Sequence, residues 1–410
     1  MLESLPQARD RIQKGKCSLV DVHQLSVLVL LIISGIFSPV VFAEGEFVPY
    51  VGLTVAKDDN LYRLDSDVDV SVLSSSVSRA DTIYKTRAGV AVNWKLSRQK
   101  VFADLSVTDN RFEKNSSLNY TGQDLSLKWN WLFGSYLTGQ LGWSQEQTLS
   151  DFSNTNSELS SKKYQQAVNF LAKWRYAPDW EVGLDLSGYD LSYELQALQD
   201  RDRQGVKKAF FWSYITHAGN RVGVTWARED GLYPERGITD VDNEYQQDSL
   251  LLNVVWQATV KSKLSADVGW NSRVHPTLSM KNYDGFNAKV AYTWLPTAKT
   301  MLSVDLYRQL VSSSNADATF SENTGYALNG ALRLSEKVFF NGQFKSETRD
   351  YVGRLSEFKE RYVWLTAGVT YQPYSMLDTS LRVSQSMRDS TQALRDYQSQ
   401  SVVLDFKVKF

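Results

Sequence analysis

Histidine side chains are the first candidates for chemistry, because an imidazole can act as a general base or bind a metal near neutral pH. The chain has three histidines, and two of them, His217 and His275, lie far beyond its basic N-terminal segment. A Ser–His pair or a zinc site needs several such groups within a few ångströms of one another. The turn pattern described below places these two histidines at opposite ends of the molecule. We therefore expect no catalytic residue, no resident metal and no cofactor, and we expect that the protein is not an enzyme.

A run of aspartates forms the second candidate, a calcium site. The run contains Asp58, Asp59, Asp65, Asp67 and Asp69, with Asn60 among them. It has no glycine to make the tight turn of an EF-hand loop. Solvated loop carboxylates are the commoner explanation of such a run, and both explanations stay open at this point.

The elements that must position any site are strands, because apolar and polar residues alternate throughout the chain after Phe47. The final stretch shows the pattern: Val402, Leu404, Phe406, Val408 and Phe410 share one face, while Ser401, Asp405, Lys407 and Lys409 share the other. A strand with one apolar and one polar face that ends the chain on an aromatic residue is typical of an outer-membrane barrel. A soluble barrel or propeller would need an apolar inner face, but the second face here is polar.

Alternately short and long connections separate the strand-like segments, each of about 10 to 14 residues. Counting them predicts a closed antiparallel transmembrane β-barrel of about 18 strands, with short periplasmic turns and longer extracellular loops. The first strand is expected at 47–56 and the last at 397–410. Lys57–Asp81 is the longest connection.

The N-terminus predicts export. Basic residues precede an apolar run from Leu25 to Phe37, and small residues at Val41 and Ala43 follow it. This order is typical of a signal peptide, and the apolar run is short for a membrane helix, although a retained signal anchor is the alternative. We assign 1–43 to the signal peptide and 44–410 to the barrel, in the outer membrane of a Gram-negative bacterium. The first strand would follow the cleavage site so closely that we expect no N-terminal plug domain.

Aromatic residues mark the predicted membrane borders. The chain has 12 Trp, 21 Tyr and 18 Phe. Amphipathic rings concentrate at the membrane–water interface, and tryptophans near short turns therefore predict a periplasmic girdle facing outer-membrane lipid: Trp94, Trp129, Trp131, Trp174, Trp180, Trp256 and Trp294. The last residues, Phe406, Val408 and Phe410, resemble the signature by which the barrel assembly machinery recognises outer-membrane barrels.

The lumen is the remaining candidate for a functional surface. Its predicted basic lining residues are Lys95, Lys128, Lys173, Arg175, Arg273, Lys289, Arg333, Lys345, Arg349, Arg382 and Arg388. Fewer acids oppose them, so the lumen would favour anionic solutes or polymers. Alternatively, these charges only pair across strands and hold the barrel open. The net charge of −1 argues against nucleic acid as a partner.

Three short motifs resemble the EpsL-like outer-membrane proteins of exopolysaccharide operons. They are Asp58-Asp59-Asn60-Leu61-Tyr62-Arg63-Leu64; Leu118-Asn119-Tyr120-Thr121-Gly122 with Trp129-Asn130-Trp131; and Tyr283-Asp284-Gly285-Phe286 with Trp294-Leu295-Pro296-Thr297. The resemblance implies a β-barrel porin that exports an exopolysaccharide beside a periplasmic partner of the Wza type. The alternative is a general or substrate-selective diffusion porin for small solutes. A loop folded into the lumen would favour that alternative, and Lys57–Asp81 is the candidate for such a loop.

Overall fold

The computed structural model describes residues 45–70, 77–152, 161–236, 243–276, 278–313, 318–353 and 357–410. Across these residues the chain forms 18 strands and three short 3-10 helices. The strands are β1 Gly45–Asp58, β2 Asp81–Leu96, β3 Gln99–Phe112, β4 Tyr120–Phe133, β5 Leu137–Leu149, β6 Lys162–Ala177, β7 Trp180–Tyr193, β8 Arg203–Ile215, β9 Arg221–Leu232, β10 Glu244–Thr259, β11 Ser262–Val274, β12 Tyr283–Thr297, β13 Thr300–Ser312, β14 Ala318–Arg333, β15 Val338–Gly353, β16 Phe358–Tyr374, β17 Leu377–Ser390 and β18 Tyr397–Lys409. The helices are η3 Ser116–Leu118, η5 Gln196–Arg201 and η6 Ser279–Lys281.

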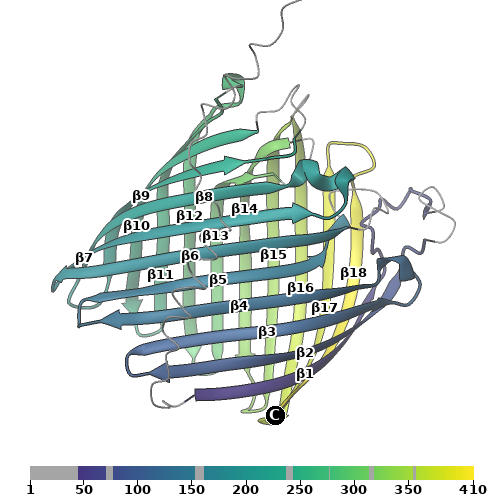
Figure 1. Cartoon of the computed structure of the whole chain (residues 1–410), viewed down its shortest axis with the longest axis horizontal. Coiled ribbons are helices and arrows are strands. Elements are labelled where there is room, and N and C mark those ends of the chain that lie inside the picture. The colour runs from purple at the N-terminus through teal and green to yellow at the C-terminus, as the bar shows by residue number, and fades with distance from the viewer. Residues whose placement is uncertain are drawn as a thin grey trace, which may run out of the picture.

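Each strand pairs antiparallel with its sequence neighbours, and β1 pairs with β18, so the sheet closes on itself (Figure 1). The β1–β18 register runs from Tyr50 opposite Lys409 to Asp58 opposite Ser401. The predicted closed antiparallel barrel of 18 strands is therefore confirmed. Its first strand is longer than predicted at both ends, because pairing with β2 extends from Gly45 opposite Trp94 to Asp58 opposite Asp81.

Short and long connections alternate around the barrel, as the sequence predicts. Connections of two to five residues join β2 to β3, β4 to β5 and each later pair of that kind, while longer ones join most of the other strands. We call the two ends of the barrel the short-turn end and the long-loop end. Both chain ends that the structure describes, Gly45 and Phe410, lie at the short-turn end, where Figure 1 marks the C-terminus.

The outward face is an apolar belt because the pleat sends every second side chain away from the lumen. Leu250, Leu252, Phe210 and Trp226 are examples, and each is about half exposed. A closed sheet satisfies its own backbone hydrogen bonds, and an apolar outside with a polar inside suits a membrane. The architecture is that of an outer-membrane β-barrel.

The predicted girdle tryptophans occupy outward-facing positions of their strands near the short-turn end. Trp174, Trp256 and Trp294 are 44–55% exposed. Trp131 differs, because its ring is only 7% exposed beneath Phe133 and Phe170. At the chain end, the Phe410 N–H donates to the Pro49 carbonyl at 2.9 Å and the ring is 70% exposed.

The predicted signal peptide, 1–43, lies outside the described residues. In the described part of the chain, no helix is long and apolar enough to cross a membrane.

Candidate functional site

The predicted basic lining residues all fall on the inward parity of their strands, but their environments differ. Nine are exposed or half-exposed toward the lumen: Lys95, Lys128, Lys173, Arg175, Lys289, Arg333, Lys345, Arg349 and Arg382. The other two, Arg273 and Arg388, are only 2% and 1% exposed. These two arginines therefore do not line open lumen as predicted. Other chain segments cover them at the long-loop end.

Aromatic rings and charges alternate on the inner wall of β15 and β16. The Tyr362 and Trp364 rings stack with centroids 5.0 Å apart, the Arg349 guanidinium lies 4.1 Å from the Tyr362 ring centre, and the Lys345 ammonium lies 4.6 Å from that of Trp364. The Glu347 carboxylate binds both cations, at 2.8 Å from Lys345 and 2.5 Å from Arg349. One carboxylate against two cations leaves this part of the wall with a net positive charge.

The short-turn half of the lumen is open and keeps unpaired cations. A cavity of about 510 Å³ follows the inner faces of β1 to β6, lined among others by Phe102, Asp104 and Lys128. A second of about 510 Å³ lies nearer the turns, against Lys95 and Lys100. Within the described ranges, no carboxylate lies within 4 Å of the ammonium group of Lys95, Lys100 or Lys128. This half of the lumen is a polar, water-accessible vestibule with exposed ammonium groups.

The first long connection folds over the mouth of the barrel. Its side chains Tyr62 and Leu64 are 1% and 3% exposed. They pack with Leu118 of η3 against Phe112, an inward residue at the end of β3. An apolar cluster on the inward side of the wall requires that this connection lie inside the rim. The inward-folding loop that the sequence offered as a candidate is therefore present in its described part.

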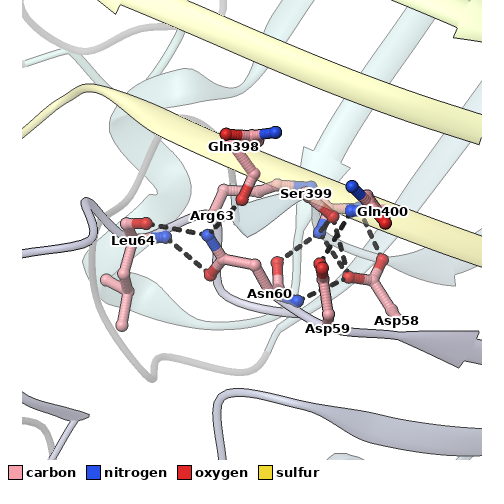
Figure 2. Close-up of polar contacts among 8 residues, drawn as sticks. All are labelled: Asp58, Asp59, Asn60, Arg63, Leu64, Gln398, Ser399 and Gln400. Atoms are coloured by element: carbon pink, nitrogen blue, oxygen red, sulfur yellow. Dashed lines mark hydrogen bonds and ion pairs between the residues drawn. The ribbon is translucent and has the colours of Figure 1, made fainter.

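Polar contacts fasten the same connection to the barrel seam (Figure 2). The Arg63 guanidinium donates to the two Asp58 carboxylate oxygens at 2.9 and 2.8 Å and to the Ser399 hydroxyl of β18 at 2.9 Å. The Asn60 amide donates to the carbonyls of Leu64 and Gln398 at 2.8 and 2.9 Å. We call these contacts the seam clasp. The motif that opens the family resemblance thus serves to hold the loop on the junction of the first and last strands.

A second segment enters the mouth at the top of β13 and β14. Pairing of β12 with β13 reaches only Ala288 opposite Arg308, whereas β13 stays paired with β14 as far as Ser312. Beyond that point the Ser312 carbonyl accepts a hydrogen bond from Arg203 of β8 at 2.7 Å, and the Ser313 carbonyl accepts one from Tyr233 at 3.0 Å. Four strands separate β8 from β13 in the sheet. The β13–β14 hairpin must therefore lean across the lumen.

Sequence reasoning missed this hairpin and Arg203. By simple alternation Phe320 shares the outward face with Tyr326, but it is 1% exposed and packs on Arg273 and His275. His275, which follows β11, is itself only 1% exposed, and its ring stacks on Phe320 of this hairpin.

The structure also locates the aspartate run that the sequence offers as a possible calcium site. Its first member, Asp58, binds Arg63 and Ser399 in the seam clasp and does not face solvent. Over the described ranges, no group of three or more His, Cys, Asp or Glu residues is arranged to hold a metal ion.

Comparisons with known proteins agree with this geometry. Residues 257–410 match the family model described as putative beta-barrel porin 2. No curated protein matches the chain significantly. Among solved structures, the chain is similar to OccK2 (OpdF) of Pseudomonas aeruginosa, with a TM-score of 0.50 at 10% identity over 90% of this chain and 98% of that one.

Two further solved structures match nearly as well. OccK9 (OpdG) of Pseudomonas aeruginosa gives a TM-score of 0.49 at 11% identity over 90% of this chain and 99% of that one. OccAB3 of Acinetobacter baumannii gives 0.48 at 9% identity over 90% and 100%. The similarity to OccK2, at 10% identity, shows a shared fold, that of an outer-membrane β-barrel.

Proposed function

We propose that the protein is a selective diffusion channel that carries small polar solutes, with a preference for anions, across the outer membrane. One observation carries this proposal: two chain segments fold into the long-loop mouth, above a lumen that is open and polar toward the short turns. A porin that selects by size needs such a constriction between wider vestibules. The match to a porin family over residues 257–410 supports a channel rather than an enzyme.

The preference for anions follows from where the unpaired charge lies. Near the mouth, Lys345 and Arg349 share the single carboxylate of Glu347, which offsets one of their two positive charges. In the short-turn vestibule, Lys95 and Lys128 are exposed without a carboxylate within 4 Å among the described residues. Rings of cationic side chains favour anions in a pore. An anion that enters the vestibule therefore meets a net positive wall.

Export of an exopolysaccharide, which the family resemblance implies, fits this geometry less well. A polymer in transit needs a bore that stays continuous for the whole chain length. Here Arg203 and Tyr233 hold the β13–β14 hairpin, and the seam clasp holds the first connection, so the export function requires both segments to leave the mouth. A periplasmic partner of the Wza type would have to accompany that change.

Liposome swelling with the purified protein tests the proposal. We expect fast uptake of monosaccharides, a steep fall in rate for tri- and tetrasaccharides, and an anion-selective reversal potential in planar bilayers. A wide conductance that an anionic polysaccharide blocks transiently, together with no size cut-off, would overturn the diffusion channel and favour polymer export.

A further inference from the structure

The barrel wall has a gap in its strand pairing between β12 and β13, toward the long-loop end. Pairing of these two strands ends at Ala288 opposite Arg308, although β12 begins at Tyr283 and β13 runs on to Ser312. On their other sides β12 stays paired with β11 and β13 with β14 over these residues. Each strand therefore has an edge without a strand partner in the described part of the chain. We call this gap the wall split.

The wall split lies at the level of the apolar belt. Phe286 faces outward beside it on β12, and Trp270 faces outward opposite Phe286 on β11. Leu306 faces outward on β13, just below the last paired residues. All three are about half exposed, so this part of the wall meets lipid. An open strand edge at such a depth has to be covered by other groups or to line a cavity.

Three polar side chains bridge the split. The Arg308 guanidinium binds the Glu322 carboxylate at 2.9 Å, and the Tyr283 hydroxyl donates to the same carboxylate. The Tyr283 ring also packs edge-on against Phe320 of β14, with ring centres 5.7 Å apart. One guanidinium offsets one carboxylate, so the bridge has no net charge. We call these contacts the latch, because side chains here join β12 to the β13–β14 hairpin where backbone pairing has ended.

A hollow of about 450 Å³ follows the outward face next to the latch. Arg308 lines it where the strand pairing ends. Apolar side chains of three neighbouring strands, all on the outward face, line the part below: Ala288, Val290, Leu306 and Tyr326. A concave apolar space with a few polar groups at one end is the usual form of a small-molecule site, and this one opens toward lipid.

A second cavity, of about 400 Å³, lies on the lumen side of the same strand. Leu310 and Val311 line it, two and three residues beyond Arg308. Leu191 of β7 adds an apolar side chain. One stretch of β13, residues 306–312, thus lines the outer hollow at one end and the inner cavity at the other, with the latch between them.

We propose that the wall split is a lateral portal, through which small uncharged solutes with an apolar body pass between the lumen and the lipid. Arg203, Arg273 and Glu229 also line the inner cavity and offer hydrogen bonds to a polar end of such a solute. A charged solute would have to leave water for the apolar hollow, which is costly. The latch consists of side chains, so the portal opens without breaking the paired sheet. This function goes beyond the diffusion channel, which follows the barrel axis and does not need the split.

Uptake of N-phenyl-1-naphthylamine tests the portal in cells that carry the full-length protein in their outer membrane. This dye is uncharged and apolar, and its fluorescence rises when it enters hydrocarbon. Cells with the protein should take it up at least threefold faster than cells without it. Ala288→Trp fills the outer hollow and should remove most of this gain, since tryptophan is well tolerated near the membrane border. Ala367→Trp is the matched control, because Ala367 faces outward on β16 and is paired on both sides.

A gain-of-function variant guards against loss of fold. Tyr283→Phe keeps the ring on Phe320 and removes the hydroxyl from Glu322, so dye uptake should rise severalfold. No gain in uptake over cells without the protein, equal uptake in Ala288→Trp and Ala367→Trp, or unchanged uptake in Tyr283→Phe would each overturn the portal.

Liposome swelling with a small sugar separates the portal from the channel. Sugar uptake should be the same in Ala288→Trp as in the unchanged protein, because the outer hollow lies outside the lumen. If Ala288→Trp slowed dye and sugar alike, the lateral route would be overturned. Sugar uptake without any dye uptake would leave the diffusion channel standing and remove the portal.

Discussion

Replacing Arg63 with alanine should release the first long connection from the barrel seam. Arg63 and Asp58 form a pair whose side chains are 23% and 11% exposed. In the variant, the Asp58 carboxylate keeps the Asn60 N–H and the Ser399 hydroxyl as donors but loses both guanidinium contacts. The strand itself should persist, because β1 is paired on both sides.

The size of the effect follows from burial. Removing one member of a buried pair costs roughly 3–5 kcal/mol, and two remaining hydrogen bonds to the carboxylate reduce that figure. We expect about 2–3 kcal/mol for local opening of the connection, or a rise of roughly 30- to 150-fold in the open population.

Hydrogen exchange of backbone amides measures this opening directly. The Leu61 N–H donates to the Arg79 carbonyl at 2.8 Å and the Leu64 N–H to Asn60 Oδ1 at 3.0 Å, so both report on the closed connection. In Arg63→Ala these amides should lose about 100-fold of protection. The amide of Leu105, at the centre of β3, should not change.

Arg111→Ala is the matched control. Arg111 binds Asp109 at a similar distance of 2.8 Å through its Nε alone, and the two side chains are 61% and 42% exposed. An exposed pair contributes below about 1 kcal/mol, so exchange near it should change less than about fivefold. If Arg63→Ala altered exchange no more than Arg111→Ala, burial of the seam clasp would not be what holds the loop.

Three further outcomes are expected. Burial and neighbouring acids raise the pKa of Asp202 from 3.8 to about 6. The folded state therefore keeps this proton to a higher pH than the unfolded chain does, and the β7–β8 connection should loosen as pH rises from about 4 to 6. Hydrogen exchange of the Tyr193 amide, which donates to the Asp202 carboxylate at 2.8 Å, should show this loosening, and Asp202→Asn should abolish its pH dependence. Gly139→Ala would place its Cβ 2.1 Å from a backbone carbonyl and 2.2 Å from a tryptophan ring, and should lower stability by about 1–3 kcal/mol in urea unfolding, whereas Gly330→Ala, with its nearest atom at 3.6 Å, should not. Tyr233→Phe removes one hydrogen bond from the β13–β14 hairpin and should raise the open fraction of single channels about fivefold, since such a bond contributes about 1 kcal/mol; unchanged gating would mean that the hairpin does not limit the mouth.

The barrel itself could be predicted from sequence because its period is a consequence of the backbone. Side chains of a strand alternate between two faces, and a membrane barrel gives those faces opposite solvents. The final strand shows how little else is needed, since Leu404 and Phe406 lie outward and Asp405 inward, with Val403 an apolar exception on the inward face. The ends of strands are harder to predict from the same pattern. The sequence places Asp58 in the first connection, but in the structure it pairs with both Asp81 and Ser401.

The mouth could not be predicted in the same way. The alternation of residues assigns each side chain to one face of its strand, but it does not identify the residues against which that face packs. Phe320 has the parity of a lipid-facing residue, yet the β13–β14 hairpin has separated from β12 and turned its outer face onto Arg273, while β14 stays paired with β15. No local signal marks the place where β13 separates from β12. The separation depends on partners such as Arg203 and Tyr233, which are remote in sequence.

The distribution of charge connects the two halves of the molecule. Near the mouth, acids such as Glu347 and Asp58 form ion pairs with neighbouring cations, and those pairs build the wall and fasten the loop. Arg273 departs from this rule, since it is as buried as those groups and has only neutral partners among the described residues. A structural arginine at that depth would be expected to have a carboxylate beside it. In the proposed channel, Arg273 therefore extends the positive charge of the short-turn vestibule toward the mouth, where the other cations share their wall with acids.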